Sequence, residues 1–472
     1  AMYADVDIII RSGKVARVVN GTLGAQTELT LPYGKETYNV PCNTFMGRAN
    51  ITLDPSSSVN NKDEYTDKRV IITELYGGST GRGHTGKVVV NNPFYGISTV
   101  TINGGTFQIL PEKNDKKDNI LCGIFGAGAG GMNGIGYGDD AADTHTPDDR
   151  IPYWNDSKNV MLYGPYATAK DRLVSYHCYN TDTQDFTEVS PTDTRSVIVI
   201  NGGEFGCDSA SIDGIYGGGS GFMSKSLWTK SAATPSQYGG NVYGNGNKKD
   251  VVTSLTINGG EFYCKKGVFA GGRGTDYFFS TNAYGGNSLN CKELGKTYGN
   301  VELNINGGIF HCPIFGGGYG VADAQQLDAK SNIETLSRMA RVYGKSDVNI
   351  QSGVFFNNVY GGGDMAVVEN RGGDATNVVI GNNADIRGSV FAGGNGRRLR
   401  PSTQTFAAND SLTQHPDSVG LVIGNANVSL IGSAEQAPYV YGDIFGGGNL
   451  AQVSTDTYVS IYAGNMAGQI FE

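Results

Sequence analysis

The chain alternates hydrophobic and polar residues in short runs that recur along its whole length. In the clearest copy, residues 301–318, apolar residues occupy every second position (Val301, Leu303, Ile305) before Asn-Gly-Gly and a shorter run that ends in Ile-Phe-Gly-Gly-Gly. A period of two predicts β-strands with one buried side and one solvent-facing side. Such self-similarity predicts a stack of repeated units rather than one globular core.

Two signatures define the unit. The first, Asn-Gly-Gly-x-Phe, recurs at 103–107, 201–205, 258–262 and 306–310. The second is an aromatic residue before a Gly-rich triplet, at Phe125, Tyr216, Phe269, Phe315, Tyr360, Phe391 and Phe445. If successive units run in the same direction, equivalent positions stack about 4.8 Å apart. We therefore expect a ladder of asparagines, a column of phenylalanines, and a column of buried thiols at Cys207, Cys264 and Cys312.

The asparagine ladder, the aromatic columns and the Gly-Gly-x-Phe…Val-Tyr-Gly-Gly-Gly unit resemble the right-handed parallel β-helix of the pectin-lyase-like superfamily. The unit is also similar to repeats in large secreted or surface proteins of Bacteroides-type gut bacteria. The resemblance implies an all-β solenoid of about ten coils, formed by residues 1–472 as a single domain. The repeat is already running near residue 6 and still running near residue 471, so we expect a fragment of a longer repeat protein.

The extra length between copies falls mostly at one phase of the unit, after the Gly-rich triplets. The variable segments are residues 130–195, 220–250, 273–300, 319–346 and 395–420. Insertions at one phase of a coil must emerge along one edge of the stack. The sequence therefore predicts a lateral surface of loops.

Composition narrows the function classes. The net charge is -9 and charged residues make up 17%, which argues against a nucleic-acid binder because such a protein needs a basic face. No apolar run is long enough for a membrane-spanning helix, and no secretory signal is visible. A weakly charged, acidic chain with 26 tyrosines favours a secreted or cell-surface protein that meets neutral sugars or other proteins.

One acidic loop is the candidate metal site, with Asp139, Asp140, Asp143, Asp148 and Asp149. Calcium prefers several carboxylate and carbonyl oxygens within reach of one another. A solvated surface loop is the alternative interpretation. No other cofactor is predicted, because the five histidines lack metal-ligand spacing and read as ordinary loop residues.

Two further groups are candidate ligand-binding residues. Arg397, Arg398 and Arg400 form the one dense basic cluster, and arginines hold anionic glycans through bidentate contacts. Tyr153 and Trp154, in the longest insertion, either stack on sugar rings or pin the loop to its scaffold.

A rigid rod with loops along one flank favours a binding protein, acting in adhesion or glycan recognition, with a glycan or a host or cell-surface protein as partner. The alternative is a polysaccharide lyase or glycoside hydrolase with its cleft on the β-helix face. The resemblance implies acidic calcium ligands and an Arg or Lys base for a uronate lyase, and no residues match that pattern. A structural spacer is the third hypothesis. Convergent carboxylates beside a Lys or Arg would favour the enzyme. A loop surface that carries aromatic side chains and no such carboxylate group would favour the binding protein.

Overall fold

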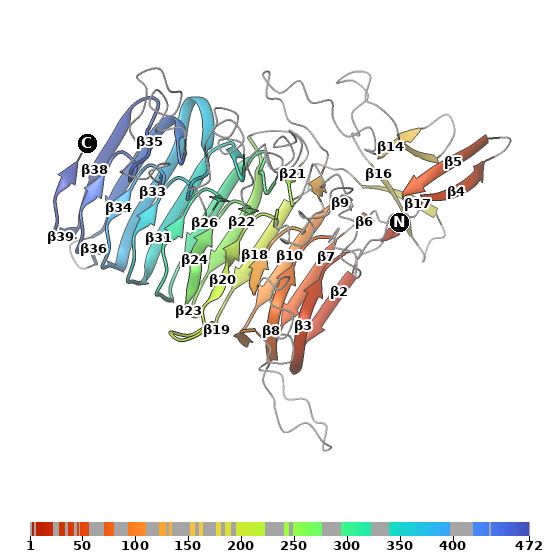
Figure 1. Cartoon of the computed structure of the whole chain (residues 1–472), viewed down its shortest axis with the longest axis horizontal. Coiled ribbons are helices and arrows are strands. Elements are labelled where there is room, and N and C mark those ends of the chain that lie inside the picture. Colours follow the sequence, from red (N-terminus) through yellow and green to blue (C-terminus); the bar gives the residue numbers. More distant parts are fainter. Residues whose placement is uncertain are drawn as a thin grey trace, which may run out of the picture.

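The computed structural model describes the main body of the chain. The described residues are 6–21, 48–55, 70–79, 93–109, 122–128, 195–221, 240–244, 249–275, 294–321, 339–396, 419–433 and 436–471, with short strand segments elsewhere between residues 2 and 189. They form β-strands and no helix. The strands stack in parallel into a long solenoid (Figure 1).

Ten strands form the first side of the solenoid. In stacking order they are β2 (Val6–Ile10), β7 (Ala49–Leu53), β10 (Ile97–Ile102), β18 (Arg195–Ile200), β22 (Val251–Ile257), β26 (Asn300–Ile305), β31 (Ser346–Phe355), β33 (Val368–Ile386), β35 (Val422–Ile431) and β38 (Thr457–Ile461). Every pairing is parallel, so each strand starts a new coil. The predicted all-β parallel β-helix of about ten coils is confirmed.

Shorter strands form the second and third sides. The second side comprises β3 (Gly13–Val19), β8 (Val70–Tyr76), β11 (Thr106–Phe107), β19 (Glu204–Phe205), β23 (Glu261–Phe262), β27 (Ile309–Phe310), the ends of β31 and β33, β36 (Tyr439–Val440) and β39 (Asn465–Met466). The third comprises the ends of β3 and β8, then β12 (Gly123–Phe125), β20 (Ile212–Tyr216), β24 (Cys264–Phe269), β28 (Ile314–Phe315), β32 (Val359–Tyr360), β34 (Val390–Phe391), β37 (Ile444–Phe445) and β40 (Ile470–Phe471).

A fourth, shorter ladder follows the third side. It contains β1 (Met2–Tyr3), β6 (Phe45–Met46), β9 (Pro93–Tyr95), β13 (Met132–Gly134) and β21 (Val242–Gly244). Two further parallel pairs lie beside it. They join β25 (Arg273–Thr275) to β29 (Tyr319–Val321), and β30 (Val342–Tyr343) to β33. Three antiparallel hairpins interrupt the first half of the chain: β4–β5 (Glu28–Tyr33, Glu36–Pro41), β14–β15 (Pro152–Asn155, Val160–Tyr163) and β16–β17 (Tyr176–Asn180, Asp185–Val189).

In chain order, the long insertions after residue 221 all join the solenoid at one edge, but they lie outside the described residues, so the predicted surface of loops stays a prediction. Residues 222–239, 276–293, 322–338 and 397–418 all lie between the third side and the next strand of the first side. Parallel bridges such as Tyr319↔Asp364 and Asp364↔Asn395 join the segments that lead into this edge from neighbouring coils. We call it the loop edge. In Figure 1, β9 and β21 lie toward the upper margin, and β19 and β23 of the second side lie along the lower margin.

Two stacks of aromatic rings fill the core. Phe107, Phe205, Phe262, Phe310 and Phe355 follow one another on the second side with ring centroids 4.6 to 4.9 Å apart. On the third side, the aromatic residues before the Gly-rich triplets, together with Tyr76, stack at 4.5 to 5.1 Å. Stacked aromatic pairs contribute about 0.5–1.5 kcal/mol beyond the area they bury. The predicted phenylalanine column is confirmed.

The asparagine ladder also forms as predicted. The side-chain amide of Asn306 donates to Oδ1 of Asn258 (2.8 Å), and that of Asn258 donates to Oδ1 of Asn201 (2.7 Å). Asn201 in turn donates to Oδ1 of Asn103 (2.8 Å). Each inner member therefore both donates and accepts, whereas Asn103 serves the ladder as an acceptor.

The thiol column differs from the prediction at one member. Cys264 and Cys312 are buried, but Cys207 is exposed, and no disulfide joins the described cysteines. Cys207 closes a tight turn with Ala210, so Ile212 takes the inward position beside Cys264. Cys122 is buried on the same side, and burial raises its pKa to about 12.

A column of buried hydroxyls closes five of the coils, and no repeat signature predicts it. The column lies on the first side, is interrupted at Val301, and has five fully buried members: Ser98, Ser196, Thr253, Ser346 and Thr376. Each donates to the carbonyl that follows a third-side aromatic residue, as Ser346 does to Gly361 (2.9 Å) and Thr376 to Ala392 (2.7 Å). These bonds tie the first side to the third. They also explain Gly316, where an added Cβ would overlap Ser346 Oγ.

The ladder's direction gives a test. Asn258→Asp removes the donor to Asn201 and sets two oxygens against each other, so we expect a loss of about 1 kcal/mol in the free energy of unfolding. Asn103→Asp keeps its acceptor role and is the matched control. Equal destabilisation of both variants in thermal or urea unfolding would contradict the ladder.

The core stack gives a second test. We expect Phe310→Ala to cost about 3–5 kcal/mol, because it opens a cavity between two stacked rings. Phe356→Ala, one residue after Phe355 of the buried column and 41% exposed, should cost about 1 kcal/mol or less. Urea unfolding followed by circular dichroism measures both, and similar losses would be inconsistent with the assigned burial.

Candidate functional site

The candidate residues inferred from the sequence lie in the insertions. Asp139, Asp140, Asp143, Asp148 and Asp149 fall outside the described residues, and so do Arg397, Arg398 and Arg400. Tyr153 and Trp154 belong to β14, of which the structure describes the backbone alone. The calcium and ligand-binding assignments therefore stay predictions.

The described solenoid carries clustered side chains on two outward faces. The first is the solvent side of the first ladder, which we call the polar face. In β26 and β31 buried and partly exposed residues alternate, so Glu302, Asn304, Asp347 and Asn349 all point outward. The same alternation that builds the core therefore sorts these polar side chains onto one surface.

Two carboxylates stand side by side on this face. Glu302 and Asp347 are register partners on adjacent parallel strands, which lie about 4.8 Å apart. Partial burial, followed by the charge of Asp347, raises the pKa of Glu302, and Lys345 and Arg195 oppose that shift. The pair thus places a carboxyl group with a raised pKa beside a second carboxyl group.

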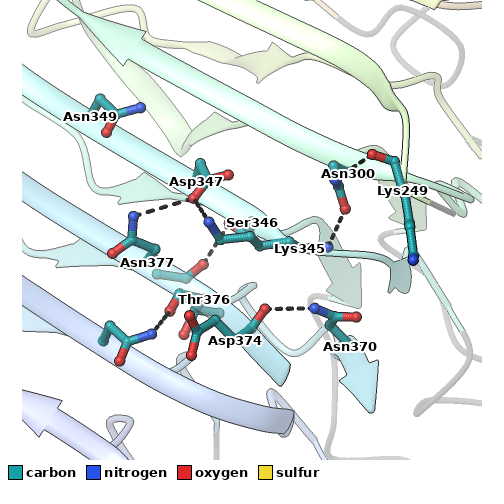
Figure 2. Close-up of polar contacts among 12 residues, drawn as sticks. Lys249, Asn300, Lys345, Ser346, Asp347, Asn349, Asn370, Asp374, Thr376 and Asn377 are labelled. Atoms are coloured by element: carbon teal, nitrogen blue, oxygen red, sulfur yellow. Dashed lines mark hydrogen bonds and ion pairs between the residues drawn. The ribbon is translucent and has the colours of Figure 1, made fainter. Parts of the chain in front are cut away.

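Polar contacts hold Asp347 and its surroundings in place (Figure 2). Lys345 Nζ lies 2.7 Å from an Asp347 oxygen, and Asn377 donates to the same oxygen at 3.3 Å. The backbone N–H of Lys345 donates to Asn300, which itself donates to the carbonyl of Lys249 (both 2.8 Å). Lys345, which directly precedes β31, is therefore held in place by hydrogen bonds to neighbouring coils.

This arrangement has the elements of acid–base chemistry. Two carboxyl groups whose surroundings separate their pKa values are the usual pattern of a general acid and its partner. These two carboxylates were not among the candidates inferred from the sequence, because they lie 45 residues apart and no motif within one strand joins them. The available signal was that Glu302 and Asp347 occupy the same position of consecutive repeats. Within the described ranges, no group of three or more His, Cys, Asp or Glu side chains is placed to hold a metal ion.

The second face is formed by two outward columns on the second side, which we call the aromatic strip. The column within the strands contains Glu261, Ile309, Val354, Asp385 and Tyr439. The column just after the strands contains Tyr263, His311, Phe356, Arg387 and Tyr441.

Side chains of the aromatic strip stack on one another from coil to coil. The rings of Tyr263 and His311 are 4.0 Å apart, those of His311 and Phe356 4.8 Å, and the Arg387 guanidinium lies 4.4 Å above Phe356. Glu261 accepts from the Tyr263 hydroxyl at 3.0 Å and lies 3.0 Å from His311 Nε2. His311, in the bend that follows β27, is therefore the middle ring of a stack.

The exposed apolar side chains of the strip lie on both sides of one charged coil, which carries Asp385 and Arg387. Ile309, Phe356, Tyr439 and Tyr441 are 36 to 50% exposed. Because each ring lies against the next, the stack turns ring edges toward solvent and offers few free faces to a sugar. Aromatic residues, an aliphatic side chain and an arginine together are typical of a protein–protein contact.

No family model matches the chain, and no curated protein and no solved structure is significantly similar to it. In the described part of the chain, no helix is long and apolar enough to cross a membrane.

The raised pKa of Glu302 predicts a pH-dependent effect on stability. The folded chain keeps this proton at pH values where the unfolded chain has released it, so the associated stability is lost as pH rises through the folded pKa. Glu302→Gln cannot ionise. We therefore expect its Tm to exceed the wild-type Tm at pH 7, with the difference vanishing near pH ~4.

The source of the effect is tested in an Asp347→Asn background, where the like charge is absent. There Glu302→Gln should give a smaller gain in Tm at pH 7. A Tm at pH 7 below that of the wild type would mean that ionised Glu302 stabilises the fold, contrary to the assignment.

Proposed function

We propose that this protein is a secreted or cell-surface binding protein that recognises a glycan or a cell-surface protein through loops on one flank. The observation that carries the proposal is the loop edge. In chain order, four long insertions fall between a third-side strand and the next first-side strand, and the described segments on either side of them are linked through parallel strand pairing and bridges. Loops mounted on a rigid scaffold are where binding residues concentrate.

The scaffold suits this role because it is stiff and modular. Each coil is tied to the next by backbone bonds, ring stacks and side-chain ladders, so loops from neighbouring coils keep a set spacing. The resemblance to the pectin-lyase-like superfamily and to Bacteroides-type surface proteins supports an extracellular setting. Within this proposal, Tyr153 and Trp154 stack on sugar rings, Arg397, Arg398 and Arg400 hold an anionic group, and the acidic loop from Asp139 to Asp149 binds calcium.

A second candidate function is favoured by the carboxylate pair on the polar face. Retaining glycoside hydrolases use two carboxyl groups about 5–5.5 Å apart. Glu302 as acid and Asp347 as nucleophile would lie on adjacent strands, and the direction of the Glu302 pKa would suit the acid. The ion pair with Lys345 weighs against it, since it occupies the carboxylate that would attack.

A glycan array with the full chain separates the two functions. We expect binding to one glycan class, without new reducing ends or unsaturated products on prolonged incubation. Replacing residues 397–418 by a Gly-Ser linker of equal length should weaken binding about tenfold or more. Glu302→Gln, on another face of the solenoid, is the matched control and should bind as the wild type does.

The opposite outcome identifies the enzyme. Product formation that Glu302→Gln and Asp347→Asn abolish, with binding unaffected by the loop replacement, would overturn the binding proposal. Absence of both binding and turnover on glycans and on cell-surface extracts would leave the structural spacer as the better description.

A further inference from the structure

We propose that Lys345 and Asn377 become joined by a covalent amide bond between their side chains, with Asp347 as the proton carrier and with release of ammonia. The bond ties the coil of β31 to the coil of β33. The inference goes beyond the proposed function, since it concerns the polar face and not the loop edge. It rests on the meeting of an amine and an amide at one carboxylate oxygen.

Asp347 holds the amine and the amide side by side (Figure 2). Its Oδ1 lies 2.7 Å from Nζ of Lys345 and accepts from Nδ2 of Asn377 at 3.3 Å. The two nitrogens are therefore at most about 6 Å apart, the sum of those two distances. Cγ of Asn377 is bonded to Nδ2, and the stem of a lysine is flexible, so rotation within the stem carries Nζ toward this carbon.

The backbone is fixed on both strands at this point. Asp347 and Asn377 are register partners on the adjacent parallel strands β31 and β33. The residues before them, Ser346 and Thr376, are fully buried and donate to carbonyl groups across the coil at 2.9 and 2.7 Å. A fixed backbone presents the reacting groups to each other, which removes much of the entropy cost of bringing them together.

The ion pair supplies the proton acceptor that the reaction needs. A neutral amine is a nucleophile, whereas an ammonium group has no free electron pair. Asp347 is within the contact distance at which a general base takes a proton from Lys345. The same oxygen contacts the nitrogen of Asn377 that has to leave, so one carboxyl group serves both nitrogens.

The atoms of the reaction balance. Asp347 accepts a proton from the Lys345 ammonium group, and the freed Nζ attacks Cγ of Asn377. As the Nζ–Cγ bond forms and the Cγ–Nδ2 bond breaks, Asp347 gives its proton to Nδ2 and takes one from Nζ. Ammonia leaves and takes up the proton that Asp347 then holds. The reaction consumes no oxidant, and the new amide N–H is left as a donor beside the same carboxylate.

The polar face also contains an internal reference. Asn349 donates to Oδ1 of Asn304 at 3.0 Å, one repeat position further along the same strands. Among the described residues, no lysine contacts either amide, so the groups for the reaction are incomplete there. Both amides should therefore stay unmodified.

Mass spectrometry of the purified full chain, incubated at neutral pH, tests the proposal. We expect the loss of one ammonia per chain and, after trypsin digestion, one peptide that joins Lys345 to Asn377. Lys345→Arg keeps a cation beside Asp347 but supplies no amine, and Asn377→Ala removes the carbonyl carbon, so neither variant should form the bond. Asp347→Asn should form it about a hundredfold more slowly or less, because an amide is a poor proton carrier.

The matched control is Lys249→Arg, a lysine beside the same network whose backbone carbonyl accepts from Asn300 (Figure 2). It should cross-link as the wild type does, and circular dichroism checks the fold of every variant. A wild-type chain that keeps its full mass after prolonged incubation would overturn the proposal and leave an ordinary ion pair. So would ammonia loss without the joined peptide, since the ammonia then comes from another asparagine. Wild-type rates in Asp347→Asn would refute the role of Asp347.

Discussion

The structure depends on one constraint: each coil must place its side chains directly over the equivalent side chains of the coil before it. Parallel pairing at the strand spacing brings like residues into contact, so a position is stable only if its residue tolerates its own kind as a neighbour. Phenylalanine rings, side-chain amides and branched aliphatic residues satisfy that condition. A charged residue satisfies it only with a partner, as Asp347 does with Lys345.

The same constraint shapes the outer surface. An outward position repeated in each coil becomes a column, and two columns become a face with a definite chemical character. Glu302 and Asp347 meet in this way on the polar face, and their proximity raises the pKa of Glu302. Tyr263, His311 and Phe356 meet in the same way on the aromatic strip. Candidate sites therefore arise from residues about 45 to 50 positions apart in the chain.

The solenoid also separates tasks by side. Insertions leave mainly from the loop edge, where the Gly-rich triplets end, and the second side carries the aromatic strip across the coil from them. Buried hydroxyls such as Ser346 join the first and third sides and keep the cross-section closed where the loops depart. A rod built in this way keeps the edge where the insertions join apart from the face that carries the aromatic strip.

By itself, the sequence determined the repeat, the parallel direction of the coils, the ladder at Asn258 and Asn306, and the aromatic columns. These follow from local periodicity, because a residue's place in the repeat decides its place in the coil. Tertiary structure alone decided the rest. Cys207 leaves its column because a tight turn shifts the register by several residues, and Ser346 finds its acceptor across the coil in Gly361. The pairing of Glu302 with Asp347 and the stacking of His311 likewise depend on which coils are neighbours and on the space between them. Distances and burial of this kind are set by packing, which periodicity does not encode.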